Sequence, residues 1–159
     1  MVTVTNKDLQ ILNEFLENRS VSYVLTGTAA LFYHGALPEG TEVHDIDIIV
    51  LTTDETRPAL QAMFKELETL SGCRYENEYY EQQVYIFKVG KNNVRINAFE
   101  DHPGNVQYET MIIDGNPIKV SPVMAILKAK FALKRQKDFD FYLRLIQQLS
   151  SMFLSCLKK

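Results

Sequence analysis

Residues 23–51 read YVLTGTAALFYHGALPEGTEVHDIDIIVL, and this stretch decides the fold. The apolar run Tyr23–Leu25 stops at Thr26-Gly27-Thr28, and the next five residues are mostly helix formers. This order predicts a strand, a tight turn and a helix. Glycine and proline in residues 34–44 predict a loop, and Asp45–Leu51 reads as a buried strand with two acids at its start.

The two acids, Asp45 and Asp47, share one side of the predicted strand because residues two apart on a strand project to the same face. Adjacent carboxylates repel each other, and a hard divalent cation relieves that repulsion. Mg2+ typically binds one or two protein carboxylates together with phosphate oxygens of a substrate. Gly27 allows the backbone to approach a phosphate, and a helix beginning at Thr28 presents free N–H groups to it. The stretch therefore predicts a site for metal and phosphate.

The flanking sequence predicts an α/β (α+β) fold, with a mixed sheet flanked by helices. Apolar spacing predicts a helix over residues 6–18, opened by a capping box of Thr5 and Asp8. A second amphipathic helix follows residue 54, then a hairpin over 84–99, a strand at 111–113 with a turn at 114–115, and two C-terminal helices. The apolar positions of the second helix are Leu60, Met63, Phe64, Leu67 and Leu70.

Length and composition favour a single domain over residues 1–159, with its core at about 20–120 and a C-terminal helical segment at about 121–158. The formal net charge of -3 gives no global attraction to nucleic acid or to an anionic membrane. The sequence shows neither a signal-like N-terminus nor an apolar run long enough to span a bilayer. Cys73 and Cys156 are too isolated to form a metal cluster or a disulfide framework. We therefore expect a cytoplasmic protein without a membrane role.

Leu25–Ala30 followed by Val43–Val50 resembles the signature of the nucleotidyltransferase superfamily, a Gly-Gly or Gly-Ser turn and then an acid-apolar-acid strand. Two later segments, Val120-Ser121-Pro122 leading into a helix and Arg135-Gln136-Lys137-Asp138, resemble the small bacterial members, including the toxin and antitoxin types. The resemblance covers roughly residues 20–148 and implies a nucleotidyltransferase-like sheet.

The resemblance also implies a chemistry, metal-assisted nucleotidyl transfer. Asp45 and Asp47 would hold Mg2+ (or Mn2+) on a nucleoside triphosphate, while Gly27 and Thr28 cradle the phosphates. A hydroxyl group of an acceptor would attack the α-phosphorus. The acceptor is unknown and is a protein, an RNA or a small molecule.

A basic segment follows in the C-terminal part of the chain. Lys128, Arg135 and Lys137 match family positions that face the nucleotide, and we expect Lys128 and Arg135 to bind it. Lys130 and Lys134 are assigned to a solvated helix face.

One position departs from the family pattern, because Asn97 falls where the family has a third acid. An amide oxygen can ligate a hard cation, but it carries no charge and cannot act as a general base. Asp101 lies about 13 Å further along the strand and Glu100 faces the other way, so neither replaces it. Arg95 shares the face of Asn97, where it either binds a phosphate or neutralises the acid pair in a metal-free site.

Two functions remain open on these grounds. The first is an active nucleotidyltransferase, favoured by the acid pair and the turn. The second is a module that kept the fold, lost catalysis, and binds a nucleotide or a protein partner, favoured by Asn97. A haloacid-dehalogenase-type phosphatase would need a nucleophilic Asp at the end of its first strand, and a metal-dependent glycosyltransferase usually needs a longer chain.

The last predicted helix carries one further open question. Its apolar stripe either seals the domain, which is the commoner outcome, or binds a protein partner or a second copy. The stripe consists of Tyr142, Leu145, Ile146, Leu149, Met152 and Phe153.

Overall fold

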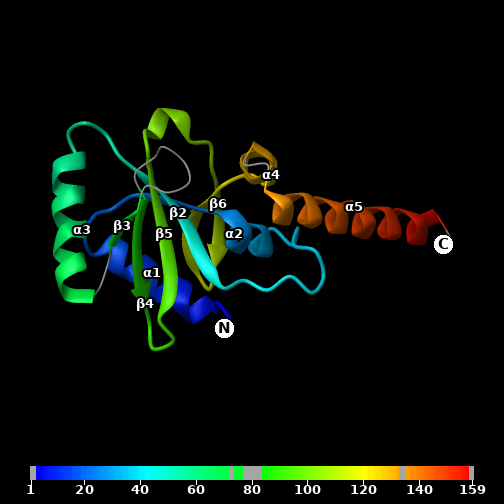
Figure 1. Ribbon diagram of the computed structural model, residues 1–159, viewed down its shortest axis with the longest axis horizontal. Helices are drawn as coiled ribbons and strands as arrows, with labels where there is room; N and C mark the ends of the chain where they lie inside the picture. Colours follow the sequence, from blue (N-terminus) through cyan, green and yellow to red (C-terminus); the bar gives the residue numbers. More distant parts are fainter. Residues whose placement is uncertain (1–2, 72–73, 77–83, 133–134, 158–159) are drawn as a thin grey trace.

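The computed structural model describes residues 3–71, 74–76, 84–132 and 135–157. Seven strands form one mixed sheet in the order β3-β4-β5-β2-β1-β7-β6 (Figure 1). The strands are β1 (Tyr23–Thr26), β2 (Asp45–Leu51), β3 (Arg74–Glu76), β4 (Val84–Val89), β5 (Val94–Asp101), β6 (Glu109–Ile113) and β7 (Asn116–Val120). The helices are α1 (Asn6–Glu17), α2 (Gly27–Tyr33), α3 (Arg57–Ser71), α4 (Val123–Ala132) and α5 (Gln136–Leu157), with a short 3-10 helix η1 (Pro103–Asn105).

The strand β2 lies near the middle of the sheet and organises it. It pairs antiparallel with β1 and parallel with β5. In this register Thr26 lies opposite Asp47 on one side, and Asn97 lies opposite Asp47 on the other. The end of β1, the start of β2 and the middle of β5 therefore meet at one place.

Helices α1 and α3 cover one face of the sheet. Phe87 of β4 packs against Phe15 of α1 and Phe64 of α3, with ring centroids 5.9 and 5.8 Å apart. The pairing continues from Phe87 through Ile96 of β5 to Ile46 of β2, so these residues share that face. Because side chains alternate along a strand, the acids of β2 project to the opposite face.

Most predicted elements are present. The capping box is confirmed, since Thr5 Oγ1 accepts from the Asp8 backbone N–H while the Asp8 carboxylate accepts from the Thr5 backbone N–H. The strand Asp45–Leu51 and the hairpin β4–β5 are also confirmed. Two short strands, β3 and β7, were not predicted, because three residues carry little signal and β7 contains Pro117. Lys134, Cys73 and the side chains of Leu67 and Leu70 lie outside the described residues.

The hydrophobic core includes residues from both ends of the described chain. It includes Leu9, Leu12 and Leu16 of α1, and at the other end Phe141 and Leu145 of α5. Among the described residues, no helix has both the length and the apolarity needed to cross a membrane.

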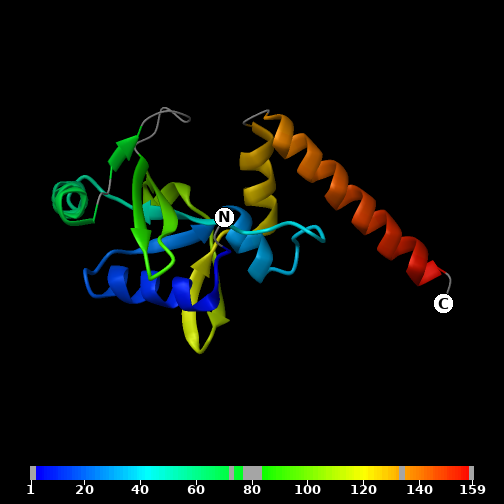
Figure 2. The ribbon, with the colours of Figure 1, turned by 60° about the horizontal axis from the view of Figure 1, so that its bottom comes forward.

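The last helix, α5, extends away from the sheet and ends far from it (Figures 1 and 2). Of its 22 residues, those buried are Asp138, Phe141 and Leu145, all in the first half. Of the two alternatives for its apolar stripe, sealing of the domain therefore holds only as far as Leu145. Ile146, Leu149, Met152 and Phe153 are each more than half exposed.

Candidate functional site

The turn after β1 lies directly against the acid strand. Gly27 begins α2 with φ +67°, a conformation that favours glycine. A Cβ at this position would overlap the Asp47 carboxylate oxygen Oδ2 and would lie 3.0 Å from the Asp47 Cβ. Two predicted features far apart in the sequence are thus in contact, and glycine is needed for both the backbone and the space.

Asp45 and Asp47 project to the same face of β2, as predicted, and both are partly exposed. The intervening Ile46 and the following Ile48 are fully buried. The strand thereby fixes two carboxylates beside each other at the edge of solvent.

Asn97 bridges the two acids from the neighbouring strand. Its amide nitrogen Nδ2 donates to Asp47 Oδ1 at 2.8 Å and to Asp45 Oδ2 at 3.2 Å. Its amide oxygen Oδ1 accepts from Arg95 Nε at 2.9 Å. A guanidinium only donates and an ionised carboxylate only accepts, so these partners fix the orientation of the amide.

The two ends of the Asn97 amide have different partners. The amide oxygen, the atom that could ligate a cation, faces Arg95, and the NH2 group faces the acids. Asn97 thus offers hydrogen bonds to both carboxylates. Arg95 donates to the amide oxygen, and both roles expected for Arg95 stay predictions.

The two neighbouring acids do not replace the missing carboxylate. Asp101 lies four register positions beyond Asn97, and its Oδ1 accepts from the backbone N–H of His102 at 2.7 Å. Glu100 accepts from Tyr85 Oη at 3.3 Å and lies 3.8 Å from Arg57. Both are occupied outside the acid pair.

Lys130 enters the site, contrary to its assignment to a solvated face. Its Nζ donates to Thr28 Oγ1 at 3.2 Å, in the first turn of α2. Lys128 is exposed, because residues two apart on a helix project in nearly opposite directions. A signal for this was present in the sequence, since Lys130 follows the buried Ile126 by four residues and so shares its side of α4.

Arg135 stands immediately before α5 and is held by Asp138. Its Nε donates to Asp138 Oδ2 at 2.5 Å and its second nitrogen to Asp138 Oδ1 at 3.1 Å. Asp138 is buried, so the pair is well fixed. Arg135 is near enough for its charge to act on Asp47.

The electrostatics of the site centre on Asp47. Burial and the negative charge of Asp45 raise the pKa of Asp47 to about 6, against the opposing effects of the Asn97 hydrogen bond and of Lys130 and Arg135. Burial lowers the pKa of Lys130, which the nearby acids partly offset. Asp47 is therefore ionised at neutral pH at a cost in free energy that an added cation would reduce.

The donor set fits one cation that is shared with a ligand. Within the described residues, no group of three or more His, Cys, Asp or Glu side chains could hold a metal. Asp45 and Asp47 supply two carboxylates on one face, which suits Mg2+ when phosphate oxygens and water complete its shell. The amide oxygen of Asn97 faces away from them.

No protein-family model and no curated protein matches this sequence. Among solved structures, the chain is similar to an antigenic nucleotidyltransferase-like protein from Paracoccidioides brasiliensis. The identity is 13%, the TM-score is 0.56, and the match covers 92% of this chain and 79% of that one.

It is also similar to the antibiotic-resistance factor ANT(2'')-Ia. The solution structure of that protein matches at 15% identity and TM-score 0.55, covering 96% of this chain and 88% of that one. Its crystal structure with adenylyl-2''-tobramycin matches at 15% identity and TM-score 0.54, covering 96% and 93%. At this identity the likeness concerns the fold, and the toxin or antitoxin subtype stays a prediction. Together with the turn and the acid strand in contact, these matches show that the chain has a nucleotidyltransferase-like fold.

Proposed function

We propose that this protein binds a nucleoside triphosphate together with Mg2+ (or Mn2+) at the acid pair, for nucleotidyl transfer to a hydroxyl acceptor. The observation that carries this proposal is the contact between Gly27 and Asp47. This contact places the Gly27 turn, which suits a phosphate, directly against the carboxylate of Asp47, which suits a cation. Because Gly27 has no side chain, nothing separates the turn from the carboxylate.

Each residue of the site has a role in this proposal. Asp45 and Asp47 hold the cation, and Gly27, which has no Cβ, lets the Asp47 carboxylate lie directly against the turn that would receive the phosphates. Lys130, which contacts Thr28, and Arg135 supply positive charge to the triphosphate. When bound, the cation would neutralise phosphate charge and make the α-phosphorus more susceptible to attack. Lys128, which the resemblance assigned to the nucleotide, is exposed and is left out of this set.

The nature of the reaction is supported by a structural neighbour. ANT(2'')-Ia was solved with adenylyl-2''-tobramycin, so a protein of this fold accommodates an adenylyl group joined to a small molecule. By analogy, we propose a hydroxyl acceptor of unknown identity for this chain.

A second candidate function is nucleotide binding without transfer. The orientation of Asn97 favours it, because the described residues place neither a third carboxylate nor an inward-facing amide oxygen beside the acid pair. Without such a group, the attacking hydroxyl has no general base from β5.

Calorimetric titration of the purified chain with each nucleoside triphosphate, with Mg2+ and with a chelator, tests the binding. We expect binding in Mg2+ that weakens at least about tenfold in chelator, since the acids repel phosphates without the cation. Asp47→Asn should weaken binding, whereas Glu55→Gln, at an exposed position, should not. Equal affinity in chelator and Mg2+ would contradict the proposal.

A transfer assay with α-radiolabelled triphosphates and mixed protein, RNA and small-molecule acceptors separates the two candidates. Labelled acceptor with the wild-type chain supports the transferase. Tight Mg2+-dependent binding with no label transferred supports the second candidate.

A further inference from the structure

The helix α5 carries two different stripes. One faces the body of the protein and contains the buried Asp138, Phe141 and Leu145. It continues at Gln148, whose Oε1 accepts from the Glu39 backbone N–H at 2.7 Å. These positions follow one another at three and four residues, so they form one side of the helix.

The other stripe begins at Phe139, whose ring centroid lies 5.9 Å from that of Phe131 on α4, and beyond this residue it faces away from the body. Its positions alternate by four and three residues, which is the heptad spacing of a helix that pairs with another helix. Five of the six positions are apolar, and their side chains are 40 to 67% exposed. The six positions are Phe139, Leu143, Ile146, Ser150, Phe153 and Leu157. We call these six residues and the adjacent Leu154 the outward face of α5.

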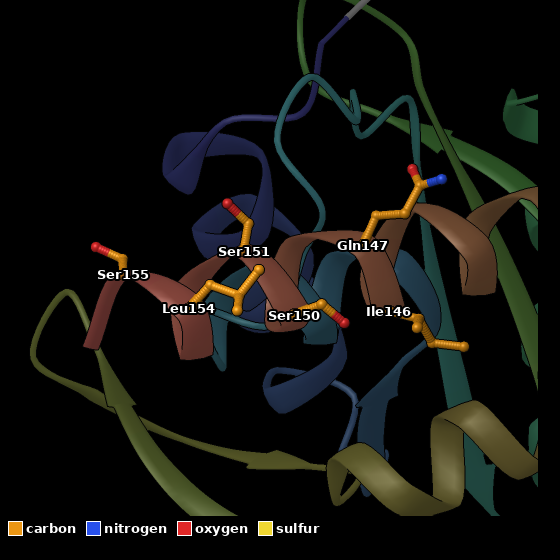
Figure 3. Close-up of a pocket in the computed structure, with 6 residues that line it drawn as sticks. All are labelled: Ile146, Gln147, Ser150, Ser151, Leu154 and Ser155. Atoms are coloured by element: carbon orange, nitrogen blue, oxygen red, sulfur yellow. The ribbon is translucent and has the colours of Figure 1, made fainter. Parts of the chain in front are cut away.

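A shallow hollow borders the outward face, along the side of α5 that carries small side chains (Figure 3). It is lined by Ile146, Gln147, Ser150, Ser151, Leu154 and Ser155. Four of the lining residues follow the spacing i, i+3, i+4, i+7: Gln147, Ser150, Ser151 and Leu154. In paired helices, four residues with this spacing form the hole that receives one side chain of the facing helix.

The charge pattern indicates that the facing helix is uncharged where it makes contact. Residues 145–157 contain no Asp, Glu, Lys or Arg. A charged partner would gain no ion pair along this length, and its charges would lose water on docking. An identical uncharged face meets the requirement.

The apolar residues are also arranged symmetrically about Ser150. Leu143 and Leu157 lie seven residues to either side, and Ile146 and Leu154 lie four residues to either side. In an antiparallel pair with a two-fold axis at Ser150, Leu143 therefore meets Leu157 and Ile146 meets Leu154 of the second copy, as an isologous contact requires. Phe153 lies opposite Gln147. The small serine allows close approach at the crossing point.

The size of the face is consistent with a stable pair. Leu143, Ile146, Phe153, Leu154 and Leu157 each expose 55 to 67% of their surface. Such a patch exceeds the scattered apolar residues of an ordinary monomer surface, and two copies together approach the roughly 1,000 Å² expected of a specific interface.

We propose that the outward face of α5 is a homodimer interface, in which two copies of the chain pair through antiparallel α5 helices with Ser150 at the two-fold axis. The body-facing stripe keeps its own contacts, so Arg135 and Asp138 retain their pairing in the dimer. This inference does not depend on nucleotide binding.

Sedimentation velocity of the full chain across a range of micromolar concentrations tests the dimer. We expect a dimer for the wild type, and for Ile146→Glu/Leu154→Glu a dissociation constant at least about 100-fold higher, because two pairs of charges would be buried. Met124→Glu is a matched control, since Met124 is 63% exposed but lies on α4. It should stay dimeric, and circular dichroism should show all three chains folded.

Oxidative cross-linking tests the arrangement, in a background with Cys73→Ser and Cys156→Ser. Ser150→Cys should form a covalent dimer, because the two positions meet at the axis. Leu157→Cys should not, because its two copies are about 20 Å apart in the antiparallel pair.

A monomeric wild type at high micromolar concentration would overturn the proposal, as would a monomer that instead binds neutral lipid vesicles through this face. Cross-linking of Leu157→Cys without Ser150→Cys would overturn the antiparallel arrangement. Unchanged triphosphate affinity in Ile146→Glu/Leu154→Glu would show that the interface and the nucleotide site are separate.

Discussion

The acid site on the sheet and the outward face of α5 each contain groups that folded proteins usually pair or bury. The groups are of opposite kinds, charged at the acid site and apolar on α5. At the acid site, Asp45 and Asp47 lie side by side and share the hydrogen bonds of one neutral amide. On α5, apolar side chains such as Ile146 and Phe153 are more than half exposed. The first region has excess charge, and the second has excess apolar surface.

The difference shows what each region needs. Carboxylates that repel each other are compensated by a cation or by cationic neighbours, and the site already has Lys130 and Arg135 close to Asp47. Exposed apolar surface is compensated by burial against more apolar surface. A small charged ligand thus suits the acid site, whereas a second copy of the chain suits the outward face of α5. If the regions are independent, a change in one should leave the other intact.

Gly27→Ala should have the largest effect on the acid site. The new Cβ overlaps the Asp47 carboxylate, and φ is +67°. We expect a loss of about 2 to 4 kcal/mol of unfolding free energy and of Mg2+-dependent triphosphate binding, while the chain stays dimeric. Chemical denaturation and calorimetry measure the two effects. Gly115→Ala is the matched control, with φ +80° but nothing within 4 Å, and should lose only about 1 to 2 kcal/mol and bind normally.

Asn97→Asp tests whether the amide has replaced a metal-binding carboxylate. It removes the donor shared by Asp45 and Asp47 and adds a third charge, so we expect a metal-free protein less stable by about 2 kcal/mol. Mn2+ affinity with triphosphate, followed by paramagnetic relaxation, should rise about tenfold or more, and transfer activity should appear or increase. The exposed Asn92→Asp serves as the control. Unchanged Mn2+ affinity would show that Asn97 is not a disabled third ligand.

Lys130→Met and Lys128→Met form a matched pair on α4. Lys130 contacts Thr28 and lies near Asp47, so its loss should weaken triphosphate binding about tenfold. Lys128 is exposed, and its loss should change the affinity by less than about twofold. Calorimetry on both variants measures the difference. The opposite ranking would return the nucleotide contact to Lys128, where the family resemblance assigned it.

Asp47→Asn should have the smallest effect on stability, and the size of this effect depends on pH. The pKa of Asp47 is raised from 3.8 to about 6 in the folded state. The folded chain therefore binds this proton more tightly than the unfolded chain, and the wild type loses stability as pH rises between these two values. We expect the variant to be more stable by about 1 kcal/mol near pH 7.5 and equal near pH 4. Thermal denaturation at both pH values measures this, with Glu55→Gln as control. A variant less stable at pH 7.5 would contradict the raised pKa.

Much of the fold was predictable because the signals are local. The alternation of Asp45-Ile46-Asp47-Ile48 determines which side chains share a face, whatever the strand packs against. The Thr5–Asp8 capping box and the turn at residues 90–93 are likewise decided within a few residues. The family resemblance then ordered these elements, and the similar solved structures agree with it.

Other features depended on contacts between distant residues. Sequence spacing alone did not show that Gly27 touches Asp47, that Asn97 turns its NH2 group toward both acids, or that Lys130 reaches Thr28. Each follows from the strand register and from the packing of α4 on α2, which join residues that are 20 to 102 positions apart.

The apolar pattern of α5 was visible in the sequence by itself, because helical periodicity is local. Which part of that pattern is buried was decided by the tertiary structure, since Leu145 is the last buried residue of the helix and Gln148 makes a further contact with the body. The sequence by itself therefore determined most of the strands, the acid pair and an amphipathic last helix. Only the three-dimensional arrangement decided which charges meet at the acids and which apolar side chains of α5 stay exposed.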